Sequence, residues 1–266
     1  PLSRDYEDLE EKLKNALGLK QVVIARIVGS SENQKSNPIE AISLSASRFL
    51  PELIKGSKYV GVGWGKTVYK TVLAMEHTKE KSEITFVPLV GSMGMKAPHY
   101  QVNSIVDRIA EKFKAESIFI NNPAFMADAK ARDLVMNDKN FSSVTNAWKE
   151  IDIAIVGLGP FSAAPGYLEN ELKKDVKKQL VTRNVIGDIL GQFFDKDGTV
   201  CQSDLESELL GIKIEDLKLV ENVVCLSGGV EKVNGIIAAA KKHYFNILFT
   251  DDITASEILS ILENDE

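Results

Sequence analysis

The stretch Val60-Gly61-Val62-Gly63-Trp64-Gly65-Lys66-Thr67-Val68 is the best guide to the fold. It follows a short apolar run, Lys58-Tyr59-Val60, that is typical of a strand, and it opens an amphipathic segment that is typical of a helix. A glycine-rich turn between strand and helix gathers unpaired backbone N–H groups and the positive end of the helix dipole at one point. The stretch therefore predicts an anion-binding turn in an α/β protein.

This turn departs from both common nucleotide-binding motifs. The P-loop pattern, aligned on Gly65-Lys66-Thr67, needs its first glycine at Val60, and Gly61 lies one residue too close. The dinucleotide pattern needs a third glycine where Lys66 stands. A phosphorylated small molecule therefore fits the turn better than ATP or NAD. A tight strand-to-helix turn without any ligand stays open as the alternative.

Composition predicts a soluble globular protein. The chain has 266 residues, 44% of them hydrophobic, which suffices for one large α/β domain or two ordinary ones. No apolar run approaches the ~18 residues that span a bilayer, and the first residues lack the pattern of a signal peptide. We therefore expect a cytoplasmic protein.

The cysteines and histidines predict neither a metal site nor a thiol nucleophile. Cys225 lies in the apolar run Val223-Val224-Cys225-Leu226 and is expected to be a buried thiol; Cys201 is the second cysteine. The three histidines are far apart and have no second ligand at metal-binding spacing. They are His77, His99 and His243.

Charge argues against a DNA-binding face on this chain. The net charge is −6, whereas non-specific DNA affinity comes from clustered Lys and Arg. The first residue is Pro1, and a helical pattern runs from Tyr6 to Leu17. Processing and excision from a longer protein both explain such a beginning.

The repeating pattern along the chain is a short apolar run, a small-residue turn and an amphipathic segment. Asn37-Pro38 predicts a helix start with a capping asparagine. Continuous apolar strands separated by helices indicate a doubly wound, mostly parallel sheet in one domain, with an insertion at about Pro160 to Val220. The predicted strands are Val22–Val28, Tyr59–Val62, Ile84–Val90, Ser117–Ile120, Ile153–Val156, Asn222–Leu226 and Asn246–Phe249.

The turns that follow these strands are rich in small or polar residues. In open α/β sheets the ligand crevice lies outside the carboxyl ends of the strands, so converging turns predict a small-molecule cleft. Such turns also favour these residue types for backbone and capping reasons alone. The turns are Gly61-Gly63-Gly65, Gly91-Ser92, Asn121-Asn122-Pro123, Gly157-Leu158-Gly159, Gly228-Gly229 and Thr250-Asp251-Asp252.

Taken together and in order, these segments resemble the sugar-binding domain of SorC/DeoR-type bacterial transcriptional regulators. The resemblance spans essentially the whole chain. Its pieces are Leu9–Leu13 with Leu17-Gly18-Leu19, Gly61–Thr67, Pro88–Ser92, Ala154–Gly159, Gly187–Leu190 with Phe194-Asp195 and Asp197-Gly198, Ser227–Val233, and Leu248–Asp252 with Thr254-Ala255.

The resemblance implies a Rossmann-like fold similar to ribose-phosphate isomerases, glucosamine-phosphate deaminases and coenzyme A transferases. It implies that residues 1–266 form a single domain that senses a sugar or sugar phosphate, forms homodimers or homotetramers, and controls an upstream helix-turn-helix domain. That DNA-binding part is missing from this sequence. No cofactor and no membrane partner are expected.

The same resemblance assigns roles within the turns. Gly63 to Thr67 is similar to the phosphate loop, Gly91, Ser92 and Gln101 match positions that line the site, and Asp188 and Lys232 match a carboxylate and an ammonium that face the sugar. Some relatives carry arginine at Gly91, which implies a ligand with fewer phosphates here. The candidate ligand-binding residues are Gly63, Trp64, Gly65, Lys66, Thr67, Gly91, Ser92, Gln101, Gly157, Gly159, Asp188, Gly228, Gly229 and Lys232.

Three of these residues have competing structural interpretations. Lys66 can point to solvent, Trp64 can be a packed core aromatic, and Asp188 can cap a helix over Ile189–Phe194. The chain is expected not to be an enzyme, because no nucleophile is paired with a base. The alternatives are a sugar-phosphate isomerase or deaminase, with Asp188, Lys232 and Asp251 as acid and base, and an oligomerisation module with a vestigial pocket.

Overall fold

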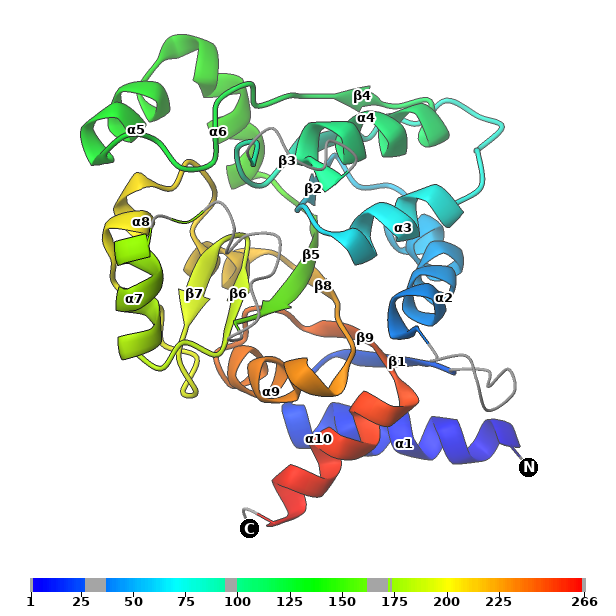
Figure 1. Cartoon of the computed structure of the whole chain (residues 1–266). Coiled ribbons are helices and arrows are strands. Elements are labelled where there is room, and N and C mark those ends of the chain that lie inside the picture. Colours follow the sequence, from blue (N-terminus) through cyan, green and yellow to red (C-terminus); the bar gives the residue numbers. More distant parts are fainter. Residues whose placement is uncertain (1, 27–36, 94–99, 162–171, 173, 265–266) are drawn as a thin grey trace.

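A parallel β-sheet with helices on both faces forms the frame of the molecule (Figure 1). The computed structural model describes residues 2–26, 37–93, 100–161, 172 and 174–264. Along the sheet, neighbouring strands pair in parallel. Their spatial order is β1 (Gln21–Ala25), β9 (Ile247–Asp251), β8 (Asn222–Leu226), β5 (Ile153–Pro160), β2 (Tyr59–Val62), β3 (Thr85–Pro88) and β4 (Glu116–Ser117).

The central strands are buried on both faces, which is why their sequences are apolar without alternation. In β8, successive residues from Val223 to Leu226 are at most 1% exposed. Phe86 and Val87 of β3 are fully buried in the same way. The predicted α/β fold class is therefore confirmed, and so is the buried thiol of Cys225.

Helices cover both faces of the sheet (Figure 1). One face carries α2 (Pro38–Leu53), α3 (Lys66–Ala74) and α4 (Val102–Phe113). The other carries α1 (Leu2–Leu17), α9 (Val233–Lys241) and α10 (Asp252–Asn264). Asn37 caps α2 as predicted, because its Oδ1 accepts the N–H of Ile39 at 3.1 Å. No helix among the described residues is long and apolar enough to cross a membrane.

The chain reverses its course across the sheet between β2 and β5. From β2 it proceeds outward to β3 and β4, whereas from β5 it proceeds the other way to β8 and β9. The strands β2 and β5 are nevertheless neighbours. Such a switch point leaves a crevice at the carboxyl ends of the two strands, because the connections leave it in opposite directions.

The segment between β5 and β8 is the predicted insertion, and its described part adds no strand to the parallel path. The last residues of β5 instead pair antiparallel with β6 (Gly187–Ile189), which forms a hairpin with β7 (Gln192–Phe194). The remaining elements are α5 (Ala129–Met136), η2 (Lys139–Phe141), α6 (Ser142–Lys149), α7 (Lys174–Thr182), α8 (Asp204–Glu208), η3 (Ile214–Leu219) and η4 (Val230–Lys232).

The predicted helix over Ile189–Phe194 is wrong. Leu190 and Gly191 have φ angles of +56° and +77°, and they form the two-residue turn of the β6–β7 hairpin. Hairpin turns with two positive φ angles match the twist of their strands, so this segment folds back on itself. The turn was missed because Leu190 is an unusual residue at positive φ.

Some predicted element bounds also differ from the structure. β4 ends at Ser117 rather than Ile120, because the Asn103 side chain accepts the N–H of Ile120 at 3.2 Å and donates to its carbonyl at 2.9 Å. The first strand ends at Ala25. Its predicted last residues, Ile27 and Val28, lie outside the described residues.

Candidate functional site

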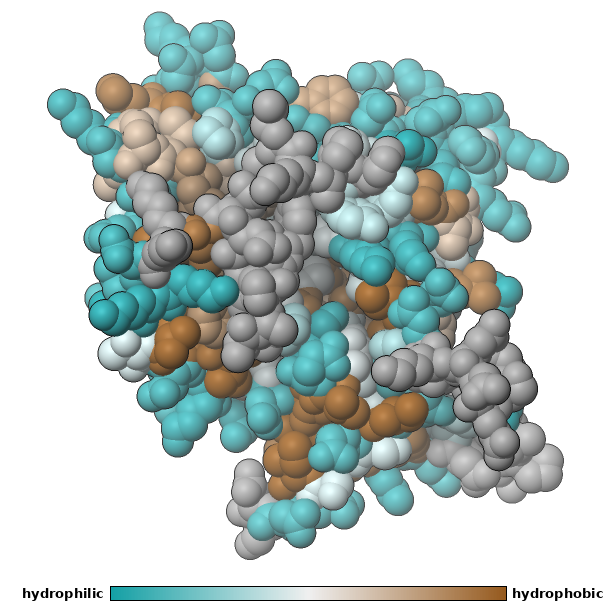
Figure 2. All heavy atoms as spheres, in the orientation of Figure 1, coloured by the Kyte–Doolittle hydropathy of each residue, from teal (hydrophilic) through white to brown (hydrophobic). Residues whose placement is uncertain are grey.

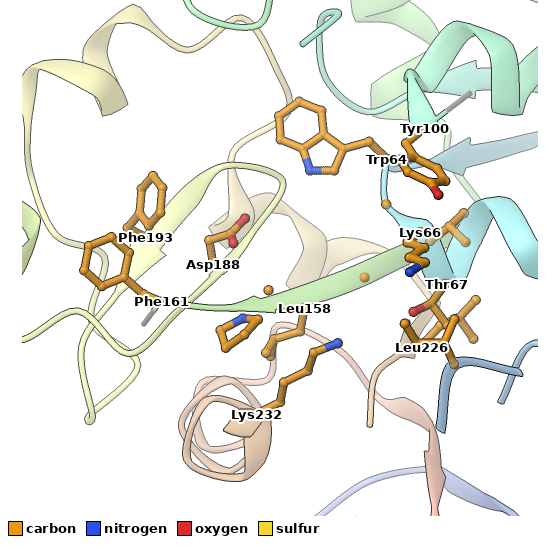
Figure 3. A pocket seen from close by; sticks show the side chains of 16 residues that line it. Trp64, Lys66, Thr67, Tyr100, Leu158, Phe161, Asp188, Phe193, Leu226 and Lys232 are labelled. Atoms are coloured by element: carbon orange, nitrogen blue, oxygen red, sulfur yellow. The ribbon is translucent and has the colours of Figure 1, made fainter. Parts of the chain in front are cut away.

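A cavity of about 280 Å³ opens where β2 and β5 end, at the switch point of the sheet (Figure 3). Its wall combines the first turn of α3, the end of β5, the β6–β7 hairpin and η4. The lining residues are Ile39, Trp64, Gly65, Lys66, Thr67, Val68, Tyr100, Gly157, Leu158, Gly159, Pro160, Phe161, Asp188, Phe193, Leu226 and Lys232. The strands thus bring together residues that are far apart in sequence.

The first turn of α3 forms one end of the cavity. Gly63 continues the pairing of β2 with β5 by donating its N–H to the Ile155 carbonyl at 2.8 Å. Gly65 then starts α3 with φ of +128°, a conformation that side chains disfavour, and no described side chain caps the helix. The N–H groups of the first turn and the positive end of the helix dipole therefore lie at the cavity wall.

Two lysines add positive charge at the same end. All three of Lys66, Thr67 and Lys232 line the cavity, and in Figure 3 the side chain of Lys232 extends toward the end that carries Lys66 and Thr67. Lys66 is exposed, Thr67 is buried and Lys232 is half-buried. In the part of the chain that the structure describes, neither amine forms an ion pair.

Burial lowers the pKa of Lys232, because an ammonium group loses hydration in the packed turn. The nearby charges of Glu231, Asp188 and Asp251 act in the opposite direction. Loss of hydration has the largest effect, so the protein environment disfavours the charged amine. An anion in the cavity would offset this penalty.

Asp188 supplies a carboxylate on the hairpin side of the cavity. It is 9% exposed, and its Oδ2 accepts the N–H of Gly191 at 3.1 Å. Asp188 therefore caps the hairpin turn rather than the helix predicted from sequence. Its partner across the pairing is Gly159, where any Cβ would lie 2.4 Å from the Asp188 Oδ1. The glycine leaves room for the carboxylate over β5.

Aromatic rings also line the wall, and sequence reasoning missed three of them. Phe161 and Phe193 meet edge to face with ring centroids 5.8 Å apart. Trp64 is 9% exposed, and it is both packed and part of the wall. Tyr100 completes the set. Phe193 pairs with Asp188 across the hairpin, so recognising the turn at Leu190-Gly191 would have revealed it.

The cavity wall includes eight of the predicted site residues and leaves out six. The eight are Trp64, Gly65, Lys66, Thr67, Gly157, Gly159, Asp188 and Lys232. The six are Gly63, Gly91, Ser92, Gln101, Gly228 and Gly229.

Gly91, Ser92 and Gln101 hold neighbouring loop segments together and do not line the cavity. A Cβ at Gly91 would lie 2.8 Å from backbone atoms of Asn122 and Pro123, so this conformation has no room for a side chain. Ser92 bonds to the same segment, since its N–H donates to the Asn122 carbonyl at 2.9 Å. The Gln101 amide bonds to the backbone N–H and carbonyl of Met93.

Gly228 and Gly229 pack against α10. The Gly229 N–H donates to the carboxylate of Asp251 at 3.1 Å and to the hydroxyl of Thr254 at 2.7 Å. A Cβ at Gly228 would lie 2.2 Å from the same carboxylate. These glycines therefore set the path of the turn that carries Lys232, and the N–H of Gly229 is already engaged.

The titratable groups beyond the cavity give no sign of nucleophilic chemistry. Burial raises the pKa of the Cys225 thiol to about 12 and raises that of Cys201 as well. Both thiols are therefore protonated at neutral pH, and neither lines the cavity. The described residues contain no group of His, Cys, Asp and Glu that could hold a metal ion, and His99 lies outside them.

Comparison with known proteins places this geometry in a family. Residues 4–260 match the family model described as "putative sugar-binding domain". The chain belongs to this family. The resemblance drawn from the sequence motifs is thereby confirmed.

Three relatives illustrate the family. The sorbitol operon regulator of Klebsiella pneumoniae is 26% identical over 267 residues, which cover 97% of this chain and 82% of the relative. The deoxyribonucleoside regulator of Bacillus subtilis is 26% identical over 263 residues, which cover 97% of this chain and 81% of the relative. The crystal structure of a transcriptional regulator from Streptococcus pneumoniae superposes with a TM-score of 0.90 at 26% identity and covers all of both chains.

We expect anion binding to weaken at alkaline pH because Lys232 loses its proton below the usual lysine range. Above about pH 9 both inorganic phosphate and a phosphate monoester are almost entirely dianionic, so any further change reports on the protein. The stability of the empty domain should change in the opposite sense. Between the lowered folded pKa and the unfolded pKa the unfolded chain binds more protons, so the contribution of Lys232 to stability rises with pH.

Calorimetric titration with inorganic phosphate at increasing pH measures this effect. The wild type should lose affinity through the alkaline range, and Lys232→Met should bind weakly throughout without that step. A step of equal size in Lys232→Met would assign the titration to another group.

Proposed function

We propose that this chain is the effector-sensing domain of a transcriptional regulator and that its effector is a phosphorylated sugar. The main support for the proposal is the chemical difference between the two ends of the cavity. One end combines a helix start that no described side chain caps with two lysine amines that form no ion pair among the described residues, and the other combines a carboxylate with aromatic rings. A sugar phosphate has the complementary distribution of charge, hydroxyl groups and apolar ring faces.

The phosphate group belongs at the first turn of α3. Backbone N–H groups of this turn and the Thr67 hydroxyl are hydrogen-bond donors, and Lys66 and Lys232 supply positive charge. Gly65 allows the backbone itself to approach the anion, because no side chain stands at the turn. The anion would also favour the charged state that burial disfavours at Lys232.

The sugar belongs between Asp188 and the aromatic side chains. A carboxylate accepts hydrogen bonds from pairs of hydroxyl groups, and the rings of Trp64, Phe161 and Phe193 cover apolar faces. A volume of about 280 Å³ lies near the lower end of ligand pockets and favours a monosaccharide over a dinucleotide. A single phosphate suits the site best, since Asp188 repels a second one and Gly91 has no room for another cation.

In this proposal the sugar phosphate controls operator binding by an upstream helix-turn-helix domain. The support comes from relatives that are named operon regulators and from the acidic charge of this chain, which is unsuited to binding DNA. Residues 1–266 then act as one effector-binding and oligomerisation unit of a cytoplasmic homodimer or homotetramer. The effector works through different affinities for two arrangements of the protomers.

The geometry weighs against an isomerase or deaminase. Asp251, the third candidate acid–base group, accepts hydrogen bonds from Gly229 and Thr254 and is absent from the cavity wall. Asp188 and Lys232 remain. Asp188 can accept hydrogen bonds from sugar hydroxyl groups and Lys232 can bind the phosphate. These two binding roles explain why the residues are in the cavity without any catalytic step.

Sugar phosphates should stabilise the domain far more than the matching free sugars. A ligand at ~100 times its dissociation constant adds about 2.7 kcal/mol to the stability of the folded state. Thermal unfolding with glucose 6-phosphate, ribose 5-phosphate and their free sugars measures the difference, with inorganic phosphate as a further control. Equal stabilisation by free sugars would contradict the assignment of the phosphate end.

Lys66→Ala and Thr67→Ala should each weaken binding of a sugar phosphate by about 1.5–3 kcal/mol, because charge-assisted hydrogen bonds are lost. Calorimetry measures the affinity, and circular dichroism checks the fold. The matched control is Lys70→Ala, one turn further along α3, where the amine pairs with Glu40 at 3.0 Å. The assignment fails if both site variants bind as tightly as the Lys70→Ala protein.

A further inference from the structure

Hydrogen bonds connect the turn that carries Lys232 to the first turn of α10. The carboxylate of Asp251 accepts the N–H of Gly229 at 3.1 Å and the hydroxyl of Thr254 at 2.6 Å. The Thr254 hydroxyl also accepts the Gly229 N–H at 2.7 Å. Asp251 is 1% exposed and Thr254 is fully buried. A buried network of this kind holds one arrangement, because breaking any bond leaves polar groups unpaired.

The position of Lys232 follows from this network over a short stretch of chain. The Lys232 N–H donates to the Gly229 carbonyl at 2.9 Å, so the two residues are held in one tight turn. Gly228 has no free space, since its missing Cβ would meet Asp251 at 2.2 Å and Ile42 at 2.5 Å. The hydrogen bonds of Gly229 thus connect the turn that carries Lys232 to Asp251 and Thr254.

The same turn of α10 contacts the N-terminal helix. Asp252 follows Asp251 directly, and its Oδ2 accepts the Tyr6 hydroxyl of α1 at 3.1 Å. Figure 1 shows α10 crossing α1 near this point. Ile253 borders the junction and is 52% exposed, and apolar side chains gather over α9 and the start of α10 in Figure 2. The junction is at the surface, whereas the network behind it is buried.

We propose that the first turn of α10 couples the cavity to α1, with Asp251 and Thr254 as positioning residues for Lys232 and with the Tyr6–Asp252 hydrogen bond as the link to α1. This coupling rests on the proposed function, because it presumes an anion beside Lys232. It gives the effector a route to the end of the domain at which the chain begins. Coupling is reciprocal, so a change at α1 also alters the affinity of the cavity.

Hydrogen–deuterium exchange of the full chain, with and without saturating inorganic phosphate, tests the coupling. Phosphate should change the exchange of α1 amides by ~5-fold or more, the lower end of allosteric couplings. Tyr6→Phe should still bind phosphate, with an affinity that changes by no more than the coupling factor, and should lose the change in α1. Thr254→Val should weaken phosphate binding and lose the change, and Thr254→Ser should restore both. Ser256→Ala is the control, because its hydroxyl bonds to the Asp252 carbonyl and not to the network.

The outcomes separate this inference from the proposed function. Phosphate binding by calorimetry with unchanged exchange in α1 would overturn the coupling and leave the sensor proposal standing. Wild-type behaviour of Thr254→Val would overturn the role of the first turn of α10. Failure of phosphate and of every sugar phosphate to bind would overturn the proposed function and the coupling with it.

Discussion

The site depends on one topological constraint, the reversal of the chain between β2 and β5. Two adjacent parallel strands end there while their connections run in opposite directions, so the crevice between them is not filled by a crossing segment. The first turn of α3 occupies one side, and the β6–β7 hairpin extends from β5 on the other. The backbone of the fold thus creates both the anion end and the sugar end.

Two electrostatic features of the cavity favour an anion. Lys232 is held where hydration of its ammonium is poor, and the start of α3 has N–H groups that no described side chain caps. Each feature alone is common in proteins. Their convergence in one small cavity favours an anionic ligand, because a single phosphate group would offset both costs. The carboxylate of Asp188 at the other side then sets the orientation of the bound molecule.

Sequence predicted the frame of the site because the frame depends on local chemistry. The glycines of Gly63-Trp64-Gly65 predict a backbone turn, and the apolar run at Val223 to Leu226 predicts a buried parallel strand. Asn37 before Pro38 similarly marks the start of α2.

The parts of the site that the sequence did not predict depend on contacts between distant segments. The hairpin at Leu190-Gly191 places a leucine at positive φ, against its local preference, and without the hairpin neither the role of Asp188 nor the position of Phe193 could be inferred. Gly228 and Gly229 belong to a predicted strand-end turn, yet packing against Asp251 takes them out of the cavity wall. Turn composition alone does not separate glycines that meet a ligand from glycines that meet the protein.

The central claim is that α3 binds the phosphate of a sugar phosphate that the protein leaves unchanged. Phosphorus NMR during titration of the domain with the most stabilising sugar phosphate tests it most directly. The account predicts a phosphorus resonance that shifts on binding to wild type, is little affected by the Lys66→Ala protein at the same concentration, and belongs to the same compound after several hours. Binding without a phosphorus shift, or conversion of the sugar phosphate into another compound, would contradict it.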